Sequence, residues 1–317
     1  MCIRSHLVHN VHCVHNVHLC SDKRCVTVMS DDAAFFQFSR SPFSLTPDPT
    51  FYFRSRSHSR VFDAVSAAIT RRESLMLVVG DLGVGKTTLC RTLMESRERR
   101  GRAALVANAL VSPEDLLRLM LQDLDAIPDG DPGQAQLAGA GLADLMRQFD
   151  EFLNALHESG DGALLIIDEA HSLPPATLEQ VIEMVNLESN RHKVLQFLLA
   201  GQPAIGGYST LPRGSEDGLA VRTRLLPLER DECGPYLHHR LAIAGGDGVT
   251  FTHQSIEVIY AMSGGLPRLV NLLCERALRE AAAARTQRIE PAMISSAASA
   301  LDLLQIRPKR FRWYATR

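Results

Sequence analysis

A glycine-rich octapeptide in the first third of the chain has the spacing of a phosphate-binding loop. Residues 80–87 read G-D-L-G-V-G-K-T, which fits the pattern G-x4-G-K-[S/T]. Glycines let backbone N–H groups turn toward a phosphate, and the helix that follows points its positive N-terminal end at the same charge. The lysine would reach the β- and γ-phosphates of a nucleotide, and the next hydroxyl would ligate Mg²⁺. The predicted cofactor-binding residues are Gly80, Asp81, Leu82, Gly83, Val84, Gly85, Lys86, Thr87 and Thr88.

Two adjacent carboxylates follow an apolar run farther along the chain. Residues 164–169 read L-L-I-I-D-E, so a buried strand would end in Asp168 and Glu169. If this strand neighbours the strand before the glycine-rich loop, both carboxylates lie beside the phosphates. Asp168 would then hold Mg²⁺ together with Thr87, and Glu169 would orient or deprotonate an attacking water. An acid that activates water favours hydrolysis of ATP over transfer of the phosphate to another acceptor.

Three more polar residues follow these motifs at positions where they could reach a nucleotide. His171 either couples to the acidic pair or simply begins a helix, and we favour the second interpretation. Gln202 follows an apolar run and could sense the γ-phosphate from the tip of a strand, or be a solvated loop amide. Arg268, near the start of a helix, could fold back over the phosphates, or lie on the surface. The catalytic candidates are Lys86, Glu169, Gln202 and Arg268.

The hydrophobic pattern predicts the elements that must position these residues. Four short unbroken apolar runs are typical of buried parallel strands, namely residues 75–79, 103–106, 164–167 and 195–199. Helical spacing occurs at residues 61–69, 86–98, 145–157 and 178–187. Residues 112–115 (S-P-E-D) resemble a helix start, with a capping serine and a proline behind it. Strands that alternate with helices predict an α/β domain with a mainly parallel sheet.

The pattern changes after residue 206, which divides the chain into regions. Residues 206–218 are loop-like, and the rest shows helical patterns, including a long helix from Pro267 to about Arg285. The predicted regions are a disordered or mis-assigned leader (1–28), an extended N-terminal wrap (29–59), an α/β nucleotide-binding domain (60–218), a helical lid domain (219–304) and a basic-aromatic tail (305–317).

The leader differs from the rest of the chain in composition. The sequence V-H-N-V-H occurs twice, at residues 8–12 and 14–18, and the first 25 residues hold five histidines and four cysteines. Such side chains suit Zn²⁺, but their spacing is not the paired arrangement of a closed structural site. We therefore predict a disordered leader without a metal site, with Met29 as an alternative start of the protein.

Overall composition narrows the class of protein. The 317 residues correspond to about two folded units, and 45% hydrophobic with 22% charged residues is ordinary for a globular protein. Acidic and basic residues number 36 and 34, so the net charge of −2 gives no electrostatic footprint for nucleic acid. The seven cysteines are too unevenly placed for a disulfide framework, which predicts a reducing, cytoplasmic compartment.

Taken together, these motifs resemble those of the AAA+ ATPases of the general secretion pathway protein A (ExeA-type) group, which includes pilus- and exopolysaccharide-associated relatives. The resemblance runs from about Phe35 to Leu303. It rests on residues 42–49 (P-F-S-L-T-P-D-P), Ser57 and His58, the two Walker motifs at 80–87 and 165–171, residues 195–203, and residues 263–271 (S-G-G-L-P-R-L-V-N). The resemblance implies an AAA+ module with ATP and Mg²⁺ held between an α/β domain and a helical lid, and it implies a homo-oligomer.

The same resemblance assigns roles to particular residues. It implies that Arg268 is the sensor arginine of the lid, that Gln202 is the strand-tip sensor, and that the stretch up to His58 is the wall beside the adenine. Relatives usually carry a Gln-Arg-Ile element that could supply an arginine to a neighbouring subunit. This chain has a glycine-rich stretch there, and the candidates for a substitute are Arg213, Arg222 and Arg224.

The end of the chain is a second departure from the secretion-type relatives, which continue into a membrane-spanning helix and a periplasmic region. The tail mixes basic and aromatic residues (R-P-K-R-F-R-W-Y, residues 307–314). This composition suits a membrane-surface contact or single-stranded nucleic acid, and a solvated terminus is the third interpretation.

The sequence therefore predicts an ATP-binding AAA+ protein that hydrolyses ATP to drive assembly of a secretion or pilus-type machine of the cell envelope. Its partners would be cell-envelope components at the cytoplasmic face of the inner membrane, and the charge balance disfavours nucleic acid. Two alternatives stay open. One is a DNA-linked helper ATPase of the transposition target-selection type, and the other is a nucleotide-dependent switch with little turnover.

Overall fold

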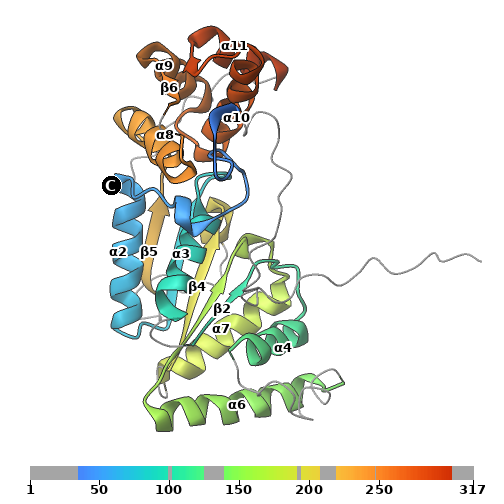
Figure 1. The fold of residues 1–317 in the computed structure, drawn as a ribbon. Helices are drawn as coiled ribbons and strands as arrows, with labels where there is room; N and C mark the ends of the chain where they lie inside the picture. The colour runs from blue at the N-terminus through green and yellow to red at the C-terminus, as the bar shows by residue number, and fades with distance from the viewer. Residues whose placement is uncertain are drawn as a thin grey trace, which may run out of the picture.

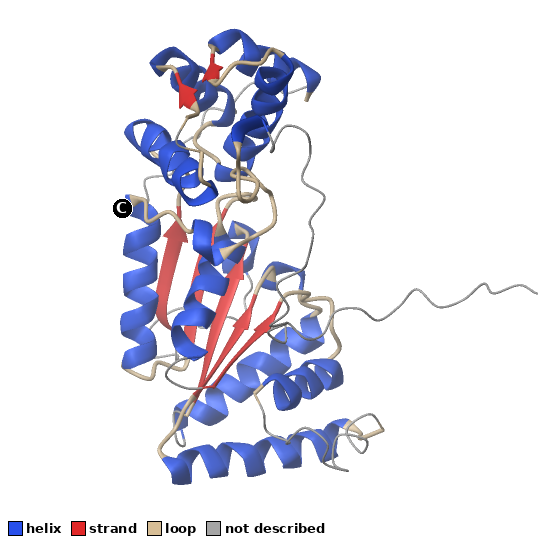
Figure 2. Ribbon diagram, in the orientation of Figure 1, coloured by secondary structure: helices blue, strands red, loops and turns tan. Residues whose placement is uncertain are grey.

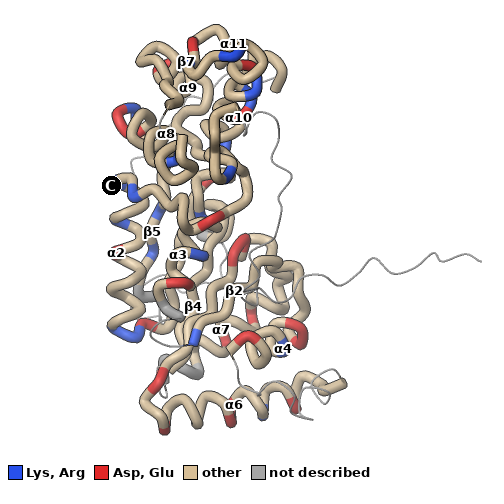
Figure 3. The backbone as a smooth tube through the Cα atoms, viewed as in Figure 1, with Lys and Arg blue, Asp and Glu red and all other residues tan. Residues whose placement is uncertain are grey.

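The chain folds into a sheet-containing part and a helical part stacked on one end of it (Figure 1). A computed structural model describes residues 35–98, 102–124, 139–190, 194–207, 219–246 and 248–301. The predictions made for the leader, for Arg213 and for the basic-aromatic tail lie outside these residues. Figure 3 shows that acidic and basic residues are distributed along the backbone of both parts. None of the helices within the described ranges combines the length and apolar character needed to cross a membrane.

A single five-stranded parallel sheet organises the larger part. Its strands are β1 (Leu75–Gly80), β2 (Arg102–Val106), β3 (Ala163–Ile167), β4 (Leu195–Gly201) and β5 (Leu219–Leu225). They lie in the order β2-β3-β4-β1-β5, and every pairing is parallel. The predicted α/β class with a parallel sheet is confirmed. The strand that carries the acidic pair is not a direct neighbour of β1, because β4 lies between them.

Strand β5 is a correction to the predicted regions, which assigned residues 219–304 to a helical lid. Residues 219–225 instead pair with β1 and close one edge of the sheet. This strand was not predicted because the segment has no continuous apolar run. Arg222 and Arg224 are exposed and alternate with less exposed residues. The helical part therefore begins only after Leu225.

Helices cover both faces of the sheet (Figure 2). They are α2 (Arg56–Thr70), α3 (Lys86–Glu98), α4 (Pro113–Asp123), α6 (Leu142–Ser159) and α7 (Pro175–Asn190). Alternate residues of β1 enter different cores, since Leu75 and Leu77 pack with α4, α6 and α7, whereas Met76 and Val78 pack with α2 and α3. The predicted start of α4 is confirmed, because the Ser112 side chain accepts a hydrogen bond from the Asp115 amide.

The helical part, which we call the lid, has its own hydrophobic core. It comprises α8 (Arg230–Ala244), α9 (His253–Ser263), α10 (Pro267–Ala283) and α11 (Pro291–Ala300), with two short paired strands, β6 (Thr250–Phe251) and β7 (Arg288–Ile289). Helix α10 begins at the predicted proline, which needs no hydrogen-bond acceptor for its nitrogen in the first turn.

The N-terminal segment, residues 35–55, completes the core of the lid. Phe36, Phe38, Phe43 and Phe51 are buried in the same cluster as the side chains of α8, α9 and α10. The predicted extended wrap ended at residue 59, but α2 already begins at Arg56, because the Ser55 side chain caps its N-terminus. The segment continues without a break from the lid into the first helix of the sheet-containing part.

Candidate functional site

The glycine-rich loop joins the central strand β1 to helix α3, as the sequence predicts for a phosphate loop. Gly83 and Gly85 have φ angles of +80° and +107°, which favour glycine over residues with a side chain. A Cβ atom at Gly85 would lie 2.9 Å from Nε2 of His58. Both conformation and space therefore require glycine at this position. Helix α3 starts at Lys86, and its first-turn N–H groups lack partners within the helix.

Lys86 lies inside the loop and is 3% exposed. Its Nζ donates hydrogen bonds to the carbonyl oxygens of Gly80 and Asp81, over 3.1 and 3.3 Å. The same nitrogen is 4.0 Å from Oε1 of Glu169. A buried ammonium group at the N-terminal end of a helix creates a strongly positive environment, which suits an anionic ligand.

Thr87 and Asp168 are in contact, although the strands that precede them in the chain, β1 and β3, are not neighbours in the sheet. The Thr87 hydroxyl donates a hydrogen bond to Oδ2 of Asp168 over 2.5 Å, and Oδ1 of Asp168 accepts from the Glu169 amide over 2.9 Å. Asp168 is 3% exposed. Hydroxyl and carboxylate oxygens are ligands that Mg²⁺ prefers, so the donor set present here fits that ion.

Glu169 has an unusual backbone conformation directly after β3. Its φ of 50° and ψ of 34° lie in the left-handed region, which is strained for a residue with a side chain. The carboxylate lines the cavity beside the loop, with Oε1 toward Lys86 and Oε2 3.3 Å from Nδ1 of His171. This carboxylate can therefore accept a proton from a molecule bound in the cavity.

Gln202 lies at the tip of β4 but is not among the residues that line the cavity. Its side-chain Nε2 lies 3.0 Å from Nε2 of His171, and its backbone N lies 3.4 Å from Nδ1 of the same ring. The sequence predicted Gln202 as a strand-tip sensor, with a solvated loop amide as the alternative, and favoured a plain helix-start role for His171. Among the described contacts of Gln202, the two to the His171 ring lead toward the site.

The lid closes the cavity from the opposite side. The backbone N–H of Arg268 donates to the Gly83 carbonyl over 3.1 Å, and the Arg268 side chain lines the cavity with Asn271. Tyr236 and Arg240, which no sequence motif marks, also line the cavity. The Tyr236 hydroxyl donates to Oδ1 of Asn271 over 2.8 Å and accepts from Arg240 over 3.0 Å. Asn271 did have a signal in the sequence, because it belongs with Arg268 to the S-G-G-L-P-R-L-V-N element, whereas Tyr236 and Arg240 lie outside it.

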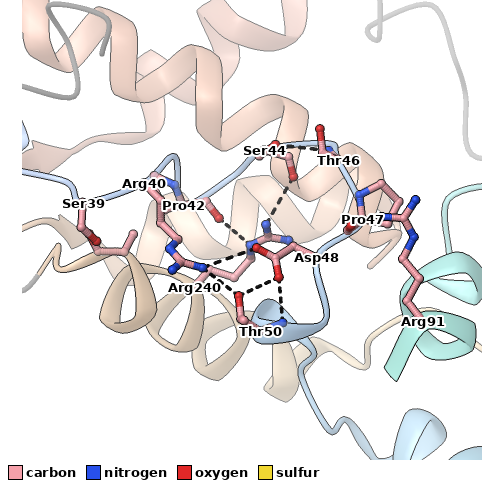
Figure 4. A network of polar contacts seen from close by, with 11 residues as sticks. Ser39, Arg40, Pro42, Ser44, Thr46, Pro47, Asp48, Thr50, Arg91 and Arg240 are labelled. Carbon is pink, nitrogen blue, oxygen red and sulfur yellow. Dashed lines mark hydrogen bonds and ion pairs between the residues drawn. The ribbon is translucent and has the colours of Figure 1, made fainter. Parts of the chain in front are cut away.

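The N-terminal segment forms a third wall of the cavity, whose volume is about 140 Å³. The lining residues of this wall are Ser44, Leu45, Thr46, Pro47, Asp48, Phe51, Tyr52 and Phe53. Figure 4 shows how arginines hold it, since Arg240 donates to the carbonyls of Pro42 and Ser44, and Arg91 of α3 donates to the Pro47 carbonyl over 2.8 Å. The wall is thus attached to the lid at one end and to α3 at the other.

His58 supports the loop from the first turn of α2. Its Nε2 lies 3.1 Å from the Val84 carbonyl, and its Nδ1 lies 2.7 Å from the Ser55 hydroxyl. The imidazole donates to the carbonyl from Nε2, so Nδ1 accepts from the hydroxyl. Burial lowers the pKa of His58 to about 4, so the ring is neutral at physiological pH.

A connection between α2 and α8 lies beside this turn. The Glu232 carboxylate accepts from the backbone amide of Arg56 over 2.7 Å with one oxygen and from the amide of Glu229 over 2.9 Å with the other. The Arg56 guanidinium also pairs with Glu229 and Asp231 of the lid. One carboxylate therefore joins the N-termini of two helices, where the helix dipoles favour negative charge.

Comparison with known proteins relates the part of the chain that contains the phosphate loop and the acidic pair to a described family. Residues 69–207 match the family described as AAA domain. The chain is 32% identical over 266 residues to general secretion pathway protein A of Aeromonas hydrophila, an alignment that covers 83% of this chain and 47% of that protein. The chain thus spans about half the length of this relative.

Solved structures with similar folds extend the comparison. Drosophila ORC bound to DNA has a TM-score of 0.63 at 12% identity, with 93% of this chain and 71% of that chain covered. Cdc6p of Pyrobaculum aerophilum also has a TM-score of 0.63, at 15% identity, with 82% and 70% covered. Aeropyrum pernix ORC2 has a TM-score of 0.61 at 17% identity, with 83% and 72% covered. At such identities the likeness concerns the fold alone. Residues 69–207 thus match the AAA domain family, and most of the chain is similar in sequence to general secretion pathway protein A.

Proposed function

We propose that this protein is a Mg²⁺-dependent ATPase. The observation that carries the proposal is the cluster of Lys86, Thr87, Asp168 and Glu169 at one end of the sheet, with Lys86, Thr87 and Glu169 lining the cavity. A cation, two oxygen ligands for a metal and a carboxylate facing the cavity are the groups that phosphoryl transfer to water requires. The AAA domain match supports nucleotide binding by the same loop.

Each residue of the cluster has a proposed role. Lys86 exchanges its contacts with the carbonyls of Gly80 and Asp81 for contacts with the β- and γ-phosphates of ATP. Thr87 and Asp168 would hold Mg²⁺, which when bound neutralises phosphate charge. Glu169 orients a water and takes its proton, because its carboxylate faces the cavity.

Two residues outside this cluster complete the proposed site. Arg268 lines the cavity from the lid, so its guanidinium can neutralise charge on the γ-phosphate as the reaction proceeds. The α10 backbone at this residue rests on the phosphate loop, which keeps the side chain within reach of the nucleotide. Gln202 acts from the tip of β4 as a sensor of the reaction.

We further propose that ATP hydrolysis drives assembly of a cell-envelope secretion or pilus-type machine at the cytoplasmic face of the membrane. The support is the 32% identity to general secretion pathway protein A, which covers most of this chain. The working form would be a homo-oligomer whose partners are components of that machine. The similarity in fold to a DNA-bound protein stands at 12% identity and adds no support for nucleic acid as a partner.

The test is Mg²⁺-dependent ATP hydrolysis across a series of protein concentrations, with and without DNA. We expect turnover that rises with concentration and is indifferent to DNA. Lys86→Met should lose ATP binding, whereas Glu169→Gln should keep binding and lose turnover by about 10²–10⁴-fold. Glu158→Gln on the exposed surface of α6 is the matched control.

Each other outcome has a defined meaning. Turnover that survives Glu169→Gln undiminished would show that this carboxylate is not the base. Stimulation by DNA with a steep salt dependence would replace the secretion proposal with a DNA-linked one. Tight ATP binding by the wild-type protein without turnover would replace the ATPase with a nucleotide switch.

A further inference from the structure

We propose that His171 is a positioning residue that links the Gln202 amide to the Glu169 carboxylate. Gln202 would then act on hydrolysis through the imidazole ring and not through its own contact with the phosphate. This inference rests on the proposed ATPase function, since Glu169 is the proposed base of that reaction. It assigns to His171 a role that the residue pattern did not favour.

The three side chains form a continuous chain of polar contacts across two strand ends. Oε2 of Glu169 lies 3.3 Å from Nδ1 of His171, and Nε2 of His171 lies 3.0 Å from Nε2 of Gln202. Glu169 lines the cavity and Gln202 does not. A signal that passes along these contacts between the cavity and the tip of β4 therefore crosses the imidazole ring.

The chemistry of the amide determines which ring nitrogen carries the proton. The NH₂ group of Gln202 only donates, so Nε2 of His171 accepts, and the proton of the neutral ring lies on Nδ1. That nitrogen faces Oε2 of Glu169. The backbone N–H of Gln202 also donates to Nδ1 over 3.4 Å, which by itself favours the other tautomer. The shorter side-chain contact at Nε2 and the Glu169 carboxylate oxygen 3.3 Å from Nδ1 both favour a proton on Nδ1.

The backbone that carries His171 is closely packed. Ala170 is fully buried, and the Ser172 amide donates to the Glu169 carbonyl over 2.8 Å. A Cβ atom at Gly201, the last residue of β4, would lie only 3.2 Å from the backbone N of His171. The ends of β3 and β4 are therefore packed closely together, and a shift at Gln202 is transmitted to the ring.

This arrangement gives the two carboxylate oxygens of Glu169 different tasks. The Nδ1–H group of His171 engages Oε2 and orients the carboxylate, while Oε1, on the Lys86 side, stays available to accept a proton from water. Loss of the ring would leave the Glu169 carboxylate in the cavity but less well oriented. The expected effect is on kcat and not on the binding of ATP.

The kinetic test compares His171→Ala, His171→Gln and Gln202→Ala with the double variant His171→Ala/Gln202→Ala in the full chain. We expect His171→Ala to lower kcat by about 10–100-fold with KM for ATP changed less than about twofold. His171→Gln should restore much of kcat, because its amide can donate and accept as the neutral ring does. The double variant should be little slower than His171→Ala alone, because both act along one path. His238→Ala and Gln254→Ala, at exposed positions of the lid, are the matched controls.

A second readout needs no turnover. Long-range ¹H–¹⁵N NMR of the imidazole rings, with His171 identified by its loss in His171→Gln, should show a proton on Nδ1 and an Nε2 resonance that shifts in Gln202→Ala. A ring protonated on Nε2 and insensitive to Gln202→Ala would overturn the proposed link. Wild-type turnover with losses that simply add in the double variant would also overturn it. Absence of wild-type turnover would instead overturn the ATPase proposal, and the coupling with it.

Discussion

The backbone N–H of Arg268 donates a hydrogen bond to the carbonyl oxygen of Gly83 over 3.1 Å, so the first turn of α10 rests directly on the phosphate loop. The contact is close, because a Cβ atom at Gly83 would lie 2.7 Å from the Cβ atom of Arg268. The loop and the lid therefore cannot rearrange independently. This docking makes the glycine-rich loop a point where nucleotide binding and lid position are coupled.

Gly83→Ala should weaken both the fold and ATP binding. The left-handed φ of +80° adds about 1–2 kcal/mol of strain for alanine, and the new methyl group would displace α10. We expect ATP affinity to fall at least about tenfold, measured by equilibrium binding of a fluorescent ATP analogue. Gly160→Ala is the matched control, because Gly160 has a φ of +73° but no atom near its Cβ position. Equal losses of affinity in the two variants would contradict the role of docking.

His58 predicts a pH dependence of stability. Its pKa is lowered from 6.5 to about 4 by burial, so below pH 6.5 the unfolded chain binds a proton that the folded protein does not. Stability should therefore fall as the pH drops from about 6.5 to about 4, by roughly 3 kcal/mol from this residue alone. Urea unfolding at several pH values measures this decrease in the free energy of unfolding.

The control for this prediction is His58→Gln, which keeps polar contacts but does not titrate. The difference between the wild-type protein and His58→Gln should shrink as the pH falls from 6.5 to 4. His239, whose pKa is also lowered by burial and by Arg240, is present in both proteins and cancels in the difference. A difference that is constant with pH would contradict the assignment of a neutral, buried ring.

Glu232→Gln should loosen the connection between α2 and α8. The buried carboxylate accepts from the amides of Arg56 and Glu229, and an amide side chain can accept at only one of these positions. We expect a loss of about 1–3 kcal/mol in the free energy of unfolding, measured by urea denaturation. Glu275→Gln, at a pair with Arg279 on α10, should change stability by less than about 0.5 kcal/mol. Comparable losses in both variants would exclude a special role for Glu232.

Arg240→Lys should release the N-terminal segment, although the substitution keeps the positive charge at this position. The Arg240 guanidinium is buried, donates to the carbonyls of Pro42 and Ser44, and stacks 4.6 Å from the Phe51 ring centre. An ammonium group cannot reach these partners and stack at the same time. We expect faster proteolysis within residues 36–53 and weaker ATP binding. Arg279→Lys, on the exposed surface of α10, should leave both unchanged. Unchanged proteolysis in Arg240→Lys would show that the phenylalanines alone hold the segment.

Much of the fold followed from local patterns. The strands β1, β3 and β4 are fully buried, so each is a continuous apolar run that can be recognised without knowing its neighbours. Strand β5 could not be recognised in this way, because an edge strand with exposed arginines has the composition of a surface loop. Its membership of the sheet depends on pairing with β1, which is far away in the sequence.

The residues of the site likewise divide into those that could be predicted from the sequence and those that could not. The loop from Gly80 to Thr87 and the pair Asp168–Glu169 could be predicted, because their chemistry depends on residues adjacent in the chain. Tyr236 and Arg240 could not, since nothing near them in the sequence marks their place at the cavity. The link from Gln202 through His171 to Glu169 depends on how β3 and β4 end side by side. The sequence by itself determined the chemistry of the phosphate loop and the acidic pair. Only the tertiary structure decided what surrounds them, because contacts between distant segments depend on packing and not on local pattern.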